Sequence, residues 1–266
     1  GNYSPNHPAV LLLKQVEKIG YKNADLIVST LANAKEHVRT VIKKPFDFYY
    51  LPMGADLDFY NLASQIPAAG IMEKKPGEFI VGYAGTLGTA NALTVIFEAA
   101  DSLRISHPHI KFAIIGDGPL KAGFQEKYKH LQNIIFFPAV RKMSLQPLLA
   151  NMDLVINTWL NIPIYRFGIS PNKWIDYMFA ARPILVAYSG YKGIIDESGC
   201  GMFVPAEDKG SLIKAIVQFS EMTVDERTLM GQKGKDYLIN NLSYESLCKP
   251  YYKILDSIIN KKIQVA

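Results

Sequence analysis

The stretch "EFIVGYAGTLGTANALTVIFEAADSLRISHPHIKFAIIGDG" (residues 78–118) decides the predicted fold of this chain. It begins with a nearly continuous apolar run that ends in glycine. It continues through an amphipathic pattern at 91–105 and closes with a second apolar run at 110–118. Apolar runs separated by a helix of about 10 to 15 residues are typical of parallel strands covered on both faces. We therefore predict two parallel strands joined by a crossover helix.

The same alternation continues along the rest of the chain. Strands are predicted at 133–140, 153–160, 183–189 and 201–206, and helices at 119–132, 144–152, 172–181, 208–222 and 225–240. This order indicates the α/β class, with a Rossmann-like doubly wound parallel sheet and helices on both faces. Ligands bind to such sheets beyond the carboxyl ends of the strands, so the loops that follow strands carry the candidate site.

The first 76 residues differ from this pattern. They contain only two predicted strands, 25–30 and 46–52, and two predicted helices, 8–19 and 33–42. Two parallel strands cannot bury both of their faces alone. This segment is therefore either the edge of the same sheet or the remnant of a second domain. Residues 61–76 are predicted to be a linker, because they carry "IPAAG" and "KKPG".

The composition is that of a globular protein, since 49% of the 266 residues are apolar and 20% are charged. The net charge of +5 suits an anionic ligand or membrane surface, but it is too diffuse to indicate nucleic-acid binding. Cys200 and Cys248 form no metal-binding or redox spacing, which favours a reducing compartment. No apolar run approaches the roughly 18 residues that span a bilayer. We expect a cytoplasmic protein, with peripheral contact to the inner face of the membrane as an open alternative.

The turn "SPNK" (170–173), directly before a predicted helix, is the strongest candidate site. Ser170 is expected to be the N-cap, with Pro171 at the first helical position. Asn172, Lys173 and the free backbone amides then surround a helix start that carries about half a positive charge. A lysine is unfavourable there unless an anion binds. A phosphate would form charge-assisted hydrogen bonds of about 1.5–3 kcal/mol each.

Asp176 follows Lys173 by three residues, on nearly the same face of the helix. Its carboxylate could accept hydrogen bonds from paired hydroxyl groups, so the two side chains together suit a diphosphate next to a sugar ring. In the alternative interpretation, Asp176 only complements the helix dipole and Lys173 points into water.

Three other loops that follow predicted strands add candidates: Gly85 and Thr86 in 82–91, Asp117 in 116–119, and Val140 in 139–143. Glycine-rich turns before helices let backbone amides approach an anion. A tight turn alone explains the first loop equally well, and it is the favoured explanation for Asp117 in the second. Backbone groups at Val140 could pair with the edge of a base. Arg141 and Lys142 are expected to be solvated. The glycine spacing is not that of the dinucleotide-binding fingerprint.

Taken together, the chain resembles the C-terminal, nucleotide-sugar-binding half of the family-4 retaining glycosyltransferases, which have the two-domain GT-B architecture. The resemblance runs through "NADLIVST", "YLPMGADLDFY", "VGYAGTLG", "FAIIGDGPL", "IIFFPAV" and "NKWIDYMFAARPILV". The order and spacing of these pieces are more specific than any one of them. The "SPNK" version is similar to enzymes that build capsule, O-antigen or exopolysaccharide units.

The resemblance implies roles for particular residues. In the family, the second of two glutamates separated by seven residues contacts the ribose, and Asp176 occupies its place. The first glutamate falls at Gly168. An arginine and a lysine that usually contact the diphosphate fall at Thr86 and approximately at Asn91. We therefore expect Lys173, helped by Arg166, to supply the missing charge, and Val140 to match the position that reads the base.

The resemblance also implies a domain division. It predicts a remnant of the N-terminal acceptor domain and the crossover at 1–60, a linker at 61–76, a donor-binding domain at 77–242, and a helix at 243–266 that crosses back. Because most of the acceptor domain is missing from this division, the chain is expected to bind the donor without transferring its sugar.

The function implied is transfer of a hexosyl or N-acetylhexosaminyl group from a nucleoside-diphosphate sugar, with UDP favoured, to a glycan or lipid-linked acceptor. Lys173 and Asp176 are the candidate catalytic residues. No metal or other cofactor is expected, and "DLD" (56–58) is interpreted as structural. The open alternatives are a nucleotide-sugar epimerase of the same architecture and a non-catalytic binding domain with a doubly wound sheet.

Overall fold

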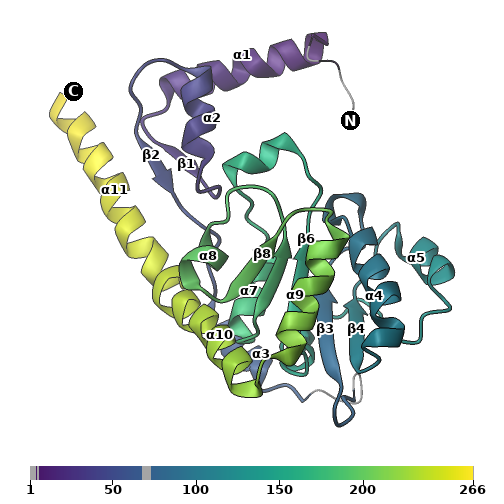
Figure 1. Cartoon of the computed structure of the whole chain (residues 1–266). Helices are drawn as coiled ribbons and strands as arrows, with labels where there is room; N and C mark the ends of the chain where they lie inside the picture. The colour runs from purple at the N-terminus through teal and green to yellow at the C-terminus, as the bar shows by residue number, and fades with distance from the viewer. Residues whose placement is uncertain (1–3, 5, 68–72, 266) are drawn as a thin grey trace.

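The structure, a computed structural model, describes residue 4, residues 6–67 and residues 73–265. Its main part is a six-stranded parallel sheet in the order β5-β4-β3-β6-β7-β8 (Figure 1). The strands are β3 (Phe79–Ala84), β4 (Ile110–Ile115), β5 (Ile134–Phe137), β6 (Leu154–Thr158), β7 (Ile184–Ala187) and β8 (Gly201–Val204). Counted from β3, this is the 3-2-1-4-5-6 order of a Rossmann sheet. The predicted doubly wound parallel sheet is confirmed.

Side chains of β3 show why the apolar runs are continuous. Phe79, Val81 and Tyr83 belong to one buried cluster, whereas Ile80 and Ala84 belong to another. Alternate residues of a strand point to opposite faces, so both faces of the sheet are covered.

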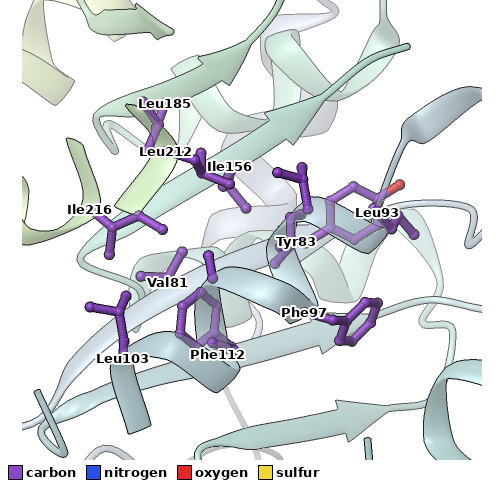
Figure 2. Close-up of a cluster of buried hydrophobic side chains, with 14 of the residues drawn as sticks. Val81, Tyr83, Leu93, Phe97, Leu103, Phe112, Ile156, Leu185, Leu212 and Ile216 are labelled. Atoms are coloured by element: carbon purple, nitrogen blue, oxygen red, sulfur yellow. The ribbon is translucent and has the colours of Figure 1, made fainter. Parts of the chain in front are cut away.

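One face packs against α4 (Thr94–Ser106), α5 (Lys121–Lys127) and α9 (Lys209–Glu221). Figure 2 shows this cluster, in which Phe97 and Leu103 of α4 and Leu212 and Ile216 of α9 lie over Val81, Phe112, Ile156 and Leu185 of the sheet. The other face packs against α3 (Leu57–Ser64), α6 (Leu145–Ala150), α7 (Asn172–Phe179) and α8 (Ile194–Ser198).

The N-terminal segment forms its own small unit. The strands β1 (Ile27–Ser29) and β2 (Phe48–Tyr50) make a separate two-stranded parallel sheet, next to α1 (Pro8–Asn23) and α2 (Ala34–Val41). The alternative that this segment is the edge of the large sheet is therefore wrong. Only three hydrophobic residues of this unit, Ile27, Val38 and Ile42, form a buried cluster among the described residues.

The helix α3 was not predicted, and it runs across the expected boundary between residues 60 and 61. Asp56 caps this helix by accepting a hydrogen bond from the backbone N–H of Phe59. Tyr60 and Ala63 are buried, and Tyr60 belongs to a core cluster of the large domain. The expected linker therefore begins inside a helix, and its residues 68–72 lie outside the described part of the chain.

The C-terminal part continues from α10 (Val224–Tyr237) through a π-helical turn at Leu238–Leu242 into α11 (Tyr244–Val265). Figure 1 shows α11 running away from the sheet domain and alongside β2. The rings of Tyr49 and Tyr251 stack there, with their centroids 5.7 Å apart. Within the described ranges, no helix combines the length and the hydropathy that crossing a membrane requires.

Candidate functional site

A cavity of about 590 Å³ opens at the carboxyl ends of the central strands. Its wall includes the residues that follow β3, β4, β5 and β6, together with the start of α7. The strand order reverses between β3 and β6, which is where ligands bind in open α/β sheets. Seven of the nine predicted site residues line this cavity: Gly85, Thr86, Asp117, Val140, Asn172, Lys173 and Asp176.

Lys173 reaches from the start of α7 across to the loop after β3. Its Nζ donates hydrogen bonds to the Tyr83 hydroxyl at 3.2 Å and to the Asn91 amide oxygen at 3.0 Å, and it lies 4.7 Å from the centroid of the Tyr83 ring. Among the described residues, no carboxylate oxygen lies within 4.0 Å of this nitrogen. Burial lowers the pKa of Lys173 to about 8. The cavity therefore contains a lysine whose charge no acidic side chain balances.

Asp176 lies one helical turn further along α7 and is 7% exposed. Its Oδ1 accepts a hydrogen bond from the Tyr60 hydroxyl at 2.7 Å and lies 3.6 Å from Nζ of Lys142. Burial raises the pKa of Asp176 above its ordinary value, and the Tyr60 hydrogen bond and the Lys142 ammonium oppose this rise. Asp176 lines the cavity, and among the described residues no hydrogen bond to its Oδ2 is found.

The start of α7 differs slightly from the prediction. The helix begins at Asn172, and Pro171 is the N-cap with an extended backbone (φ −80°, ψ 129°), while no side chain caps the helix. Asp176 consequently lies beyond the first turn. The Trp174 N–H donates to the Pro171 carbonyl, whereas the N–H groups of Asn172 and Lys173 have no backbone acceptor among the described residues. These two amides at the helix start are therefore the ones available to a ligand.

Ser170 and Arg166 do not line the cavity. Ser170 borders a second, much smaller pocket beside Gly168. Arg166 is exposed, and its guanidinium carbon lies 4.6 Å from the centroid of the Phe167 ring. Gly168 adopts a positive φ of 104°, a conformation that favours glycine over a residue with a side chain. The position at which the resemblance predicts the first carboxylate therefore carries no side chain.

The other predicted loops meet the cavity mainly through their backbones. The Gly85 N–H donates to the Ile115 carbonyl, and the Leu87 N–H donates to the Asp117 carbonyl. The Asp117 carboxylate accepts a hydrogen bond from the Gly118 N–H at 2.8 Å, within its own turn. These contacts hold the loops after β3 and β4 next to each other.

Sequence reasoning missed several residues at the site. Tyr60 could have been found through its helix, because Asp56 is followed by apolar residues at helical spacing. Lys142 is exposed, as expected, but it also lines the cavity beside Asp176, which was not expected. Trp159 also lines the cavity, and its indole N–H donates to Asn157 Oδ1 at 2.8 Å, as does that of Trp174 at 3.0 Å. The first contact joins residues two positions apart and the second joins residues 17 positions apart, and no motif in the sequence predicts either.

No group of three or more histidine, cysteine or acidic side chains is placed to hold a metal ion in the part of the chain that the structure describes. The "DLD" segment (56–58) forms the start of α3. Asp56 is its N-cap, and Asp58 lies in its first turn.

Comparisons with known proteins identify the class to which this fold and site belong. The pattern of the family described as "Glycosyl transferases group 1" matches residues 78–221, which is more than half of the chain. The chain therefore belongs to this family, and its sheet domain is the Rossmann-like domain of the GT-B architecture. A search among curated proteins finds no match.

Solved structures with the same fold support this assignment. A glycosyltransferase from Rickettsia africae has a TM-score of 0.72 at 16% identity, covering 97% of this chain and 69% of that one. Sucrose-phosphate synthase from Thermosynechococcus elongatus has a TM-score of 0.71 at 16% identity, and the match covers 94% of this chain and 62% of the synthase. HepE from Anabaena, solved with UDP-glucose, has a TM-score of 0.70 at 15% identity, and the match covers 96% of this chain and 70% of HepE. The chain also spans only 45% of TarM from S. aureus.

Proposed function

We propose that this cavity binds the nucleoside diphosphate of a sugar-nucleotide donor, with UDP favoured, and that the chain is the donor-binding part of a family-4 retaining glycosyltransferase. One observation carries the proposal. Lys173, which has no acidic partner, and Asp176, of which one oxygen accepts a hydrogen bond from Tyr60, lie one helical turn apart in the same cavity.

The diphosphate would lie between the start of α7 and the loop after β3. Lys173 Nζ and the free amides of α7 supply positive charge there, and Gly85 lets the ligand approach the backbone closely. When a glycosidic bond to the donor breaks, negative charge develops on the diphosphate oxygens. Donors that are already in position stabilise this charge without reorganisation. Lys173 would therefore assist both binding and departure of the leaving group.

The ribose and the base would occupy the other end of the cavity. Asp176 Oδ2 would accept hydrogen bonds from the ribose hydroxyls, while Tyr60 holds Oδ1. Val140 lines the cavity after β5, where its backbone would pair with the edge of the base.

The acceptor and the pathway are proposed from the neighbours. WaaG is described as a glycosyltransferase involved in lipopolysaccharide biosynthesis, and TarM was solved with UDP and alpha-GlcNAc-glycerol. We propose transfer of a hexosyl or N-acetylhexosaminyl group to a glycan or lipid-linked acceptor of a surface polysaccharide, in the cytoplasm at the inner face of the membrane. The chain spans 62% of the sucrose-phosphate synthase, so this activity is proposed for the whole enzyme.

The test is a calorimetric comparison of UDP with uridine, in the wild-type protein and in Lys173→Ala. Loss of a charge-assisted hydrogen bond to phosphate should weaken UDP binding by about tenfold to a hundredfold. Uridine binding should change less than about twofold, because uridine carries no phosphate. Lys129→Ala is the matched control, since Lys129 is exposed and paired with Glu126 on another face of the domain. Equal losses for both ligands would show that Lys173 does not contact the diphosphate.

GDP and ADP, measured in the same way, test the choice of base. Binding of UDP at least about tenfold tighter than either would support the assignment of a UDP-sugar. No binding of any of the three diphosphates would contradict the proposed function.

A further inference from the structure

Two neutral groups accept hydrogen bonds from the ammonium of Lys173. The Tyr83 hydroxyl and the Asn91 amide oxygen both accept from Nζ. Both residues also donate to the same atom, the carbonyl oxygen of Thr86, at 2.8 Å from Tyr83 and 2.9 Å from Asn91. An ammonium has three N–H donors, so one remains after these two bonds. Because Lys173 lines the cavity, this third donor is available to a ligand.

The directions of these bonds follow from Thr86. A carbonyl oxygen has two lone pairs and no hydrogen, so Tyr83 and Asn91 must each donate to it. The oxygen of the Asn91 amide then faces Lys173, while its NH₂ group faces Thr86. A flipped amide would place two donors against the ammonium, so the network fixes the orientation of Asn91.

Gly85 leaves the space that this arrangement needs. A Cβ atom at Gly85 would lie 3.1 Å from Lys173 Nζ and 3.2 Å from the Tyr83 hydroxyl oxygen. Asn91 is also held from its backbone, because its carbonyl accepts a hydrogen bond from the Thr158 hydroxyl at the end of β6. The lysine is thus fixed against the loop after β3, although it belongs to α7.

We propose that Asn91 is a positioning residue for Lys173. Its amide oxygen, together with the Tyr83 hydroxyl, holds the ammonium beside Gly85 so that the remaining N–H faces the diphosphate. The inference rests on the proposed function and extends it to a residue that contacts no part of the donor in this scheme.

The proposal depends on the fact that both acceptors, the Asn91 amide oxygen and the Tyr83 hydroxyl, are neutral. An aspartate at position 91 would attract the ammonium more strongly, but it would neutralise the charge that a diphosphate needs and would repel the phosphates themselves. An amide orients the lysine without cancelling its charge. The lowered pKa of Lys173 agrees with this environment, because burial is not offset by an acidic partner.

The first test is a double-mutant cycle with Asn91→Ala, Lys173→Met and the double variant, measured with UDP and uridine. Asn91→Ala should weaken UDP binding about fivefold, because the lysine loses one of the two groups that orient it, and leave uridine binding within about twofold. In the Lys173→Met background, Asn91→Ala should have no further effect on UDP binding. Equal losses in both backgrounds, or an equal loss for uridine, would overturn the positioning role. Asn260→Ala on α11 is the control, since its exposed amide bonds to Asp256.

The second test does not depend on a nucleotide. The pKa of the Lys173 ammonium, measured by NMR titration, should rise by about one unit or more in Asn91→Asp, and it should not change in Asn260→Asp. An unchanged value in Asn91→Asp would overturn this proposal. If the wild-type protein binds no UDP, the proposed function fails and the positioning role fails with it. If UDP binds without coupling between residues 91 and 173, the positioning role alone fails.

Discussion

Burial disfavours the charged form of Lys173, so UDP binding is expected to depend on pH. Burial lowers its pKa to about 8, compared with about 10.4 for a lysine in water. A bound diphosphate favours the charged form and should raise this pKa again. Tyr83, the titratable group in contact with the ammonium, stays neutral because burial raises its pKa. UDP binding should therefore take up a proton when the pH is near or above 8.

The measurement is the ratio of UDP to uridine affinities between pH 7 and 9, because the titration of the base cancels in this ratio. Below about pH 8 the lysine is already protonated in the free protein, so the ratio should be constant. Above that pH the ratio should fall, by up to about tenfold per unit. A constant ratio across the range, or the same fall in Lys173→Ala, would contradict the role assigned to this lysine.

Among the elements, α10 packs most tightly against the end of α7. A Cβ atom at Gly231 of α10 would lie 2.0 Å from the backbone oxygen of Ala181, which follows α7. The backbone cannot move away as a flexible side chain could, so Gly231→Ala should lower the free energy of unfolding by about 1–3 kcal/mol.

A matched helical glycine provides the control for this prediction. A Cβ atom at Gly20 of α1 would meet nothing within 4 Å, so Gly20→Ala should leave stability unchanged or raise it by up to about 1 kcal/mol. Urea denaturation of both variants gives the comparison. A Gly231→Ala protein as stable as the wild type would mean that α10 does not sit as described.

The sheet strands were predictable because their apolar runs reflect burial on both faces. β3 was expected at the start of the stretch 78–118 and is found at Phe79–Ala84, and β7 was expected at 183–189 and is found at Ile184–Ala187. The helix α3 was not expected, since "GADLDFY" was interpreted as part of the crossover. Asp56 and the apolar spacing after it would have predicted this helix.

The candidate site was predictable only in part, for a related reason. Loops after strands pointed to Gly85, Asp117 and Val140, because parallel strands end at one edge of the sheet. Asn91 contacts Lys173, 82 positions along the chain, and Tyr60 contacts Asp176, 116 positions along the chain. No local pattern encodes such pairs, so only the folded chain shows what surrounds Lys173 and Asp176.

At the scale of the whole molecule, the cavity joins three parts of the chain. The loops that follow the strands line the cavity mainly with backbone groups. The helix α7 contributes Lys173 and Asp176, and α3 contributes Tyr60, which hydrogen-bonds to Asp176. The segment around α3 also contacts the C-terminal region, because the Ala55 N–H donates to the Leu242 carbonyl and the Tyr244 N–H donates to the Ala55 carbonyl. The N-terminal unit, α11 and the cavity are therefore connected through one short segment.

A crystal structure of the protein with UDP tests the central claim most directly. It should show the two phosphoryl groups between the loop that contains Gly85 and the ammonium of Lys173, with the ribose hydroxyls on Asp176. Ordered UDP bound elsewhere on the molecule, with this cavity containing only solvent, would contradict the claim.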